Sequence, residues 1–209
     1  MHRLERALIA ALSFCILLAA WQLPFSAACG RLREHTLRLH VLANSDSEQD
    51  QQLKLAVRDA LLQELAPLSS AQDKAQALQQ LARRLSALRQ TAEQVLRQNG
   101  CSDAVRVRIC DMWFSQRSYG DATLPAGRYT ALRVEIGQAA GQNWWCVLYP
   151  ALCLPAAAER EQLAGWNEQE KEVVFGKGCE VRFWLRNGCS ALLGRHGRSC
   201  SICFLISAN

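Results

Sequence analysis

The sequence lacks the short motifs that mark most enzyme active sites. It contains no Gly-x-Ser-x-Gly elbow, no His-Glu-x-x-His pair, no phosphate-binding glycine loop and no Asp-Thr/Ser-Gly pair of an aspartic protease. It also has no basic run interleaved with aromatic residues and no motif that reads RNA or DNA. These absences argue against a catalytic protein and against a nucleic-acid-binding one. We therefore expect no catalytic residues, no cofactor and no nucleic-acid partner.

The composition is that of an ordinary folded protein. Of its 209 residues, 50% are hydrophobic and 21% are charged, and neither repeats nor low-complexity tracts occur. This length suits one domain preceded by a targeting segment. The net charge of +5 is compatible with proximity to a negatively charged membrane or cell wall.

The N-terminus has the three parts of a secretory signal. Arg3 and Arg6 precede an apolar run over residues 7–20, and the small residues Ser26, Ala27 and Ala28 follow. Residues 1–28 are therefore a signal peptide that is cleaved or a membrane anchor that is retained. Retention would use residues 7–25, because that apolar stretch is nearly long enough to span a bilayer.

The ten cysteines are many for an exported chain of this size and point to disulfides. Cys146 and Cys153 flank a segment that Pro150 must bend, so we expect these two cysteines to pair. The alternative is a thiol hydrolase in which His40 activates Cys146, which would require a free, exposed thiolate.

The C-terminal cysteines also allow a metal site. Cys189, His196, Cys200 and Cys203 are the residue types of a Cys₃His zinc set, but their spacing is irregular and export favours oxidation. We therefore expect no metal, and keep a secreted zinc-dependent hydrolase only as part of the alternative function.

The segment after residue 36 predicts a strand followed by a capped helix. Leu37, Leu39 and Val41 alternate with Arg38 and His40, which predicts one buried face and one exposed face. The polar turn from Asn44 through Ser45 and Asp46 then stops the strand. Ser45 with Glu48, or Ser47 with Asp50, supplies a capping box for the helix. Calcium is excluded at this turn because the glycine and the final glutamate of a calcium loop are missing.

The remaining pattern predicts an α+β fold. The first helix ends at Pro67, and a second one starts from a Ser70–Asp73 capping box and stops at Asn99–Gly100. Strands are expected over 105–114, 130–136 and 181–185, and a helix over 156–165. A turn or loop is expected over 120–127, and a loop leading into Trp144–Trp145. We predict a small mixed or antiparallel sheet with an antiparallel pair of long helices packed on one face. This single domain covers residues 36–186, and residues 187–209 form an atypical cysteine-rich tail.

The chain resembles the stage II sporulation protein R family of endospore-forming bacteria. The resemblance rests on two separated blocks, RLHVLANSD from Arg38 to Asp46 and WWCVLYPALC from Trp144 to Cys153. Further matching positions lie between and beside them: Asp50, Lys54, Val57–Asp59, Tyr119–Gly120, Leu124–Gly127, Tyr129 and Leu132–Val134. After Cys179 the sequence departs from the family pattern.

The resemblance implies a signalling function. Proteins of this family are exported from the forespore into the space between two membranes, where they activate a membrane-embedded, aspartic-type protease, stage II sporulation protein GA. That protease then processes the pro-form of the mother-cell sigma factor E. The family supplies no catalytic set. We expect the partner to contact Arg38, His40, Asn44, Ser45, Asp46, Trp144 and Trp145, the tandem tryptophans being either such anchors or core residues.

Overall fold

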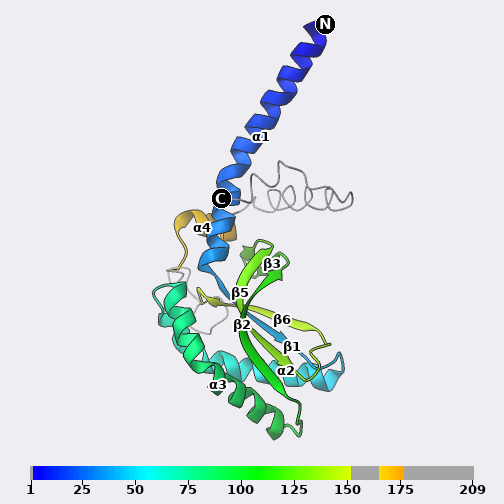
Figure 1. Cartoon of the computed structure of the whole chain (residues 1–209), viewed down its shortest axis with the longest axis vertical. Helices are drawn as coiled ribbons and strands as arrows, with labels where there is room; N and C mark the ends of the chain where they lie inside the picture. The colour runs from blue at the N-terminus through cyan, green and yellow to red at the C-terminus, as the bar shows by residue number, and fades with distance from the viewer. Residues whose placement is uncertain (1, 152–164, 177–209) are drawn as a thin grey trace.

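The computed structural model describes residues 2–151 and 165–176, which form an α+β domain with a long helix projecting from it (Figure 1). The main sheet has the strand order β2-β5-β1-β6, with bounds Val105–Phe114, Gly127–Ile136, Leu37–Leu42 and Asn143–Tyr149. β1 runs parallel to β5 and antiparallel to β6, and β2 runs antiparallel to β5. The prediction of an α+β fold with a mixed sheet is confirmed.

Two long helices cover one face of this sheet (Figure 1). They are α2, Glu48–Glu64, and α3, Lys74–Gln98, joined by the short 3-10 helix η1, Ala66–Ser70. Their apolar stripes, including Leu61 and Leu88, share one core with Leu39 of β1 and Val134 of β5. That the two helices form an antiparallel pair remains a prediction.

The helix boundaries correct two of the predicted caps. Ser47 caps α2 by accepting a hydrogen bond from the Asp50 backbone, so the Ser45–Glu48 box is wrong. Asp73, rather than Ser70, caps α3, because η1 continues through Ser70. The predicted stop of α3 at Asn99 and Gly100 is confirmed.

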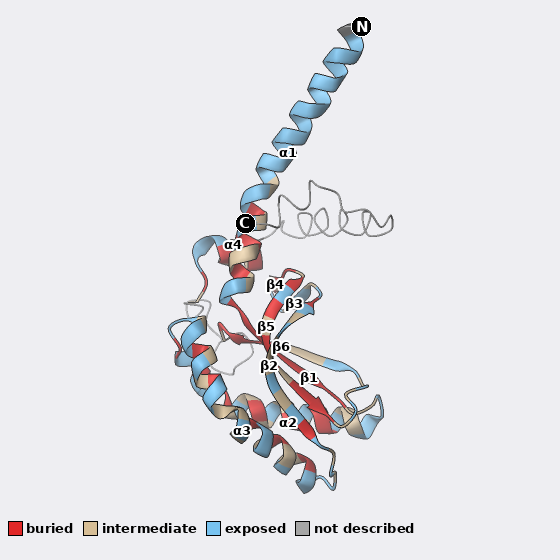
Figure 2. Cartoon of the chain, in the orientation of Figure 1, coloured by how far each residue is buried: buried red, intermediate tan, exposed pale blue. Residues whose placement is uncertain are grey.

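Among the described residues, the elements that cover the opposite face of the sheet lie at one of its ends. The covering elements are the C-terminal end of α1, His2–His35, the helix α4, Glu168–Phe175, and a hairpin of β3, Arg117–Tyr119, and β4, Ala122–Leu124. Together they bury a second core, shown red near α4 in Figure 2. The turn or loop predicted over 120–127 contains the hairpin turn, where Gly120 adopts a positive φ of 57°, but it also contains strand β4.

The tandem tryptophans lie in a strand, which corrects the predicted loop. Trp144 and Trp145 are adjacent in β6, so their side chains point to opposite faces of the sheet. β1 is buried on both faces, so the expected exposed face carrying Arg38 and His40 is also wrong. The predicted helix over 156–165, the strand over 181–185 and the tail over 187–209 lie wholly or almost wholly outside the described residues.

Helix α1 crosses the predicted cleavage site without a break. Its outer part projects away from the domain, and only 6% of its most apolar stretch is buried. The length and composition of this helix suit a membrane span or a signal sequence. Its inner part is buried in the domain through Phe25, Ala28, Cys29 and Leu32. The sequence boundary at residue 28 therefore falls inside a packed helix.

Candidate functional site

Arg38 lies on the central strand β1 and is fully buried. Its guanidinium carbon is 4.0 Å from the ring centroid of Phe114 and 5.0 Å from that of Tyr129. One terminal nitrogen donates a hydrogen bond to the Tyr119 hydroxyl on the hairpin. Three aromatic rings on three elements therefore enclose this cation.

This cation has no carboxylate against it in the described part of the chain. Its Nε and Nη1 groups are buried without a hydrogen-bond acceptor there. Burial lowers the pKa of the Arg38 guanidinium from its ordinary value, and the nearby oxygens of Tyr119 and Tyr129 partly oppose that shift. The aromatic faces supply the remaining compensation, since a desolvated cation–π contact contributes about 2 kcal/mol or more.

His40 lies two residues further along β1, on the same face. Its Nε2 is 2.6 Å from the Asn143 side-chain oxygen, an arrangement in which the ring nitrogen donates. Its ring stacks on Trp145 with centroids 4.1 Å apart. Burial, which outweighs the Asn143 hydrogen bond, lowers the pKa of His40 to about 4. A neutral, stacked imidazole results, held by an amide rather than by the carboxylate that would orient a catalytic base.

Cys146 points to the other face of the sheet. In the β1–β6 register it is paired with Leu39, whereas His40 is paired with Trp145. Because side chains alternate across a strand, the His40 ring and the Cys146 sulfur are separated by the sheet itself. Cys146 is moreover disulfide-bonded. A His40–Cys146 catalytic pair is therefore excluded; Cys153 lies outside the described residues, so the pairing of Cys146 with Cys153 remains a prediction.

The polar turn after β1 is held by internal hydrogen bonds. Asn44 and Ser45 both donate to the Asp50 carboxylate, at 3.1 and 2.5 Å. The Asn44 side-chain oxygen accepts from the Gln138 backbone, and the Asp46 carboxylate accepts from the Gln142 backbone. The bonds from Gln138 and Gln142 tie the turn to the loop between β5 and β6. The bonds to Asp50, chiefly the one from Ser45, lower the pKa of its carboxyl.

The seven residues expected to contact a partner thus occupy different environments. Arg38 and His40 are buried, and hydrogen bonds hold Asn44, Ser45 and Asp46 to the start of α2 and to the loop between β5 and β6. Trp144 packs against the helix-side core, 4.2 Å beneath the Arg58 guanidinium. Trp145 is half-buried on the opposite face, beside Phe114.

Sequence reasoning missed a charged cluster beside Trp145. Three arginines from β2 and β5 contact the carboxylate of Glu135: Arg106 at 3.2 Å, Arg108 at 3.1 Å and Arg133 at 2.8 Å. Burial alone would raise the pKa of Glu135, but Arg133 and Arg108 outweigh it and hold the pKa below its usual range. The alternating arginines of the two strands were visible in the sequence, but their register across the sheet was not.

The described residues contain no group of three or more histidine, cysteine or acidic side chains placed to hold a metal ion. The zinc set considered for the C-terminal tail lies outside them. On the sheet face that carries Arg38 and His40, the described domain presents aromatic and basic side chains.

Comparison with known proteins matches the chain to one family and one curated relative. The family model described as Stage II sporulation protein R matches residues 33–159. The Stage II sporulation protein R of Bacillus subtilis (strain 168) is 32% identical over 148 residues, which cover 68% of this chain and 66% of the relative. The alignment thus spans slightly less than two thirds of the relative's length. No solved structure matches. The matched residues include every strand of the main sheet and helices α2 and α3, and the chain belongs to the stage II sporulation protein R family.

Proposed function

We propose that this protein is a secreted sporulation signal that activates a membrane-embedded, aspartic-type protease. That protease, stage II sporulation protein GA, then processes the pro-form of the mother-cell sigma factor E. The observation that carries the proposal is the family match, which extends over the whole main sheet and its two covering helices. The protein acts in this proposal as a ligand and not as a catalyst.

The arrangement of the sheet supports a ligand over the alternative hydrolase. His40 and Cys146 lie on opposite faces of the sheet, so His40 cannot activate the Cys146 thiol as the alternative hydrolase would require. His40 instead stacks on Trp145 and bonds Asn143, which suits a structural or contact residue.

We further propose that α1 is retained as an anchor in the forespore membrane. Arg3 and Arg6 precede the apolar stretch, which favours a cytoplasmic N-terminus and places the domain in the intermembrane space. Retention is supported by the burial of Phe25, Ala28 and Leu32, which join the anchor to the domain core. The domain would then act in the intermembrane space, close to the forespore membrane that holds α1.

The test is co-expression of the full chain with the protease and the pro-sigma factor in a non-sporulating bacterium. We expect cleavage of the pro-sequence only when all three are present, and none when the protease carries a substitution of its catalytic aspartate. Absence of cleavage with correctly folded, exported protein would contradict the proposal. A hydrolytic activity of the purified chain alone would favour the alternative function.

A further inference from the structure

One end of the sheet's second face is left open by α1, α4 and the β3–β4 hairpin. There the register places Arg106 opposite Glu135, and Arg108 opposite Arg133. Arg133 pairs in turn with His40, and His40 with Trp145. We call the open surface the arginine face; it consists of Arg106, Arg108, Arg133, Glu135, Asn143 and Trp145. It lies at the end of β1 away from its junction with α1 (Figure 1).

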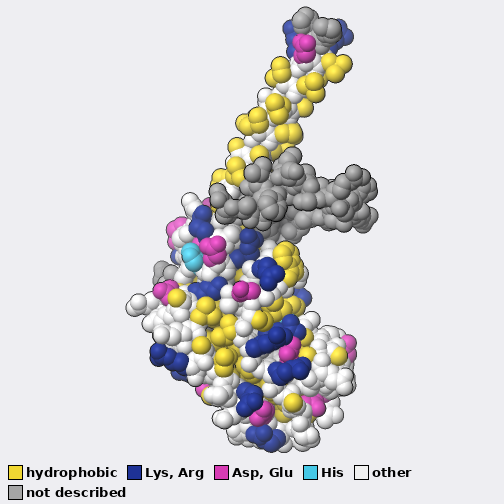
Figure 3. Space-filling view, in the orientation of Figure 1, with side chains coloured by type: hydrophobic (Ala, Val, Ile, Leu, Met, Phe, Trp, Pro, Cys, Tyr) yellow, Lys and Arg dark blue, Asp and Glu magenta, His cyan; other side chains and the backbone are white. Residues whose placement is uncertain are grey.

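The arginine face carries an excess of positive charge. Its three arginines share the single carboxylate of Glu135, whose side chain is only 8% exposed. The side chains of Arg106 and Arg108 remain 67% and 56% exposed, so most of their donors are free for another acceptor. Figure 3 shows Lys and Arg side chains gathered around acidic ones in the lower half of the molecule.

A fixed aromatic ring borders these charges. Trp145 is stacked on the buried His40 ring, and the Arg117 guanidinium of the hairpin lies 5.6 Å from the Trp145 ring centroid. Asn143 is exposed beside it and holds His40. Arginine and tryptophan are the residue types that most often dominate binding energy at protein contacts, and prior ordering lowers the entropy lost on binding.

We propose that the arginine face docks an acidic segment of a partner protein. Guanidinium groups bind carboxylates through paired hydrogen bonds, and Glu135 already shows this face accommodating one carboxylate between three arginines. Four arginines, with Arg117 included, against one glutamate leave an excess of positive charge for an acidic partner. The inference rests on the proposed function in one respect: the partner is the receptor protease of that proposal.

An anionic membrane surface fits this face less well than an acidic protein segment. Peripheral membrane binding usually combines basic residues with apolar side chains that enter the interface. Apart from α1, the exposed large hydrophobic residues of the described chain are Leu55 and Trp113, and neither belongs to the arginine face.

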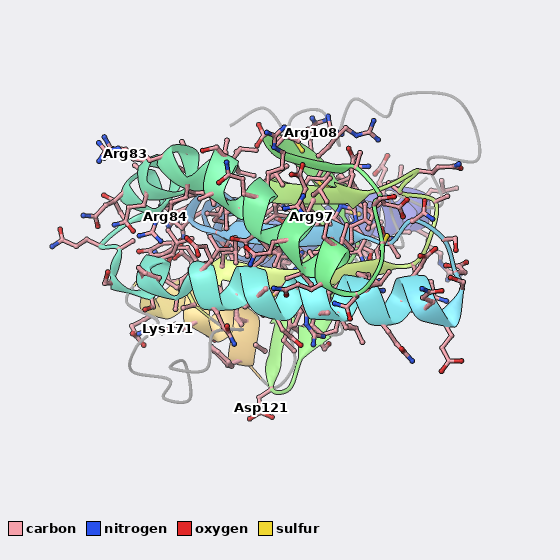
Figure 4. All side chains as sticks on the ribbon, turned by 90° about the horizontal axis from the view of Figure 1, so that it is seen from below. Arg83, Arg84, Arg97, Arg108, Asp121 and Lys171 are labelled. Atoms are coloured by element: carbon pink, nitrogen blue, oxygen red, sulfur yellow. The ribbon has the colours of Figure 1, made fainter. Side chains whose placement is uncertain are left out.

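The experiment compares two double variants of the full chain purified in detergent. Arg106→Glu with Arg108→Glu reverses charge on the arginine face, and Arg83→Glu with Arg97→Glu makes the same change on exposed positions of α3 (Figure 4). The probes are a glutamate-rich decapeptide containing one tryptophan and its glutamine counterpart. We expect the wild type and the α3 variant to prefer the acidic peptide at least tenfold, and the face variant to lose that preference.

The same variants then enter the co-expression assay. The face variant should reduce pro-sigma cleavage at least tenfold, whereas the α3 variant should not. Because Glu135 loses partners in the face variant, Arg106→Gln with Arg108→Gln provides a neutral version that avoids repulsion, and thermal unfolding of each variant verifies its fold. Loss of cleavage by both face variants, with their folding retained, supports the docking face.

Two outcomes overturn the inference. The first is unchanged peptide preference and unchanged cleavage in the folded face variants, which leaves the proposed function standing. The second is binding of lipid instead of peptide. In that case the wild type would not prefer the acidic peptide, and hydrogen exchange of the β2 backbone amides would be slower in nanodiscs containing phosphatidylglycerol than in nanodiscs of phosphatidylcholine alone. If instead the wild type binds the acidic peptide but supports no cleavage, the docking face stands and the proposed function fails.

Discussion

The guanidinium carbon of Arg38 lies 4.0 Å from the centroid of the Phe114 ring, joining the centre of the sheet to its edge strand. The Tyr119 hydroxyl accepts from the same guanidinium and so ties the β3–β4 hairpin to β1. No described carboxylate pairs with this buried cation, so burying its charge is costly and packing supplies most of its contribution to stability.

Replacing Arg38 should therefore separate packing from charge. We expect Arg38→Ala to lower the free energy of unfolding by about 2–5 kcal/mol, because it removes a long buried side chain from beneath three rings. Arg38→Met keeps much of the volume without the desolvated charge and should be close to neutral. Chemical denaturation measures both; a large loss in the methionine variant would mean that the charge itself stabilises the fold.

Acidification should destabilise the protein through His40. Its pKa of about 4 in the folded chain lies below the ordinary 6.5, so the unfolded chain binds the proton more readily. Stability is then fully present above about pH 6.5 and falls as the pH drops toward 4, by at most about 3 kcal/mol. Arg38, Arg133 and Glu135 are the charged groups that act on this ring.

The control is His40→Gln, which retains a donor for Asn143 but cannot titrate. Unfolding free energies at about pH 7 and about pH 5 should differ less in this variant than in the wild type. Keeping above about pH 4.5 avoids the range in which Glu135, whose pKa is lowered, begins to gain its proton. If the unfolding free energy changes equally in the two proteins, the pKa of His40 is not lowered in the folded chain.

Two phenylalanines on α1 should respond differently to truncation. Phe25 is buried in the second core, whereas Phe14 is 62% exposed on the projecting part of the same helix. We expect Phe25→Ala to lower the unfolding free energy in detergent by about 3–5 kcal/mol and Phe14→Ala to leave it unchanged. If Phe25→Ala has no effect, the inner part of α1 is not part of the domain and the retained-anchor proposal loses its support.

A methyl group at position 141 should disrupt the contact between the two loops at the far end of the sheet. The Cβ of Gly141→Ala would overlap the backbone carbonyl group of Ser45, and the Gly141 backbone already donates to Ala43 at 3.0 Å. We expect Gly141→Ala to lower the free energy of unfolding by about 1–3 kcal/mol. Gly30→Ala is the matched control: in α1 its Cβ would meet only the Arg33 side chain, at an ordinary contact distance of 3.9 Å, so the change should be neutral or stabilising by up to about 1 kcal/mol. Thermal unfolding of the two variants distinguishes them.

The strands and the two long helices were predictable because their patterns are local. Alternation at Leu37, Leu39 and Val41 and at the arginines of β2 predicted strands that the structure contains. Ser47 was one of two caps considered for α2, and Asn99–Gly100 gave the end of α3. The spacing of apolar residues and the residues that cap a helix are local in the sequence, so these elements can be predicted without the tertiary structure.

The errors fell where contacts between distant segments decide the outcome. Alternation at Arg38 and His40 predicted an exposed face, yet α1, α4 and the hairpin cover much of it. Gly137 and Gly141 predict a loop leading into Trp144–Trp145, whereas pairing with β1 makes the two tryptophans part of a strand. Burial of this face cannot be read from the strand alone, because two of its covering elements, the hairpin and α4, lie more than 70 residues away in the sequence.

By itself, the sequence determined the family, the α+β class, the apolar N-terminal segment and the residue types available for contact, because each follows from local pattern or direct similarity. Tertiary structure alone decided that Arg38 is enclosed, that His40 and Cys146 are on opposite faces, and that Arg106, Arg108 and Arg133 meet at Glu135. The physical reason is register: in a sheet, one residue of displacement moves every side chain to the other face, and only the paired strands fix it.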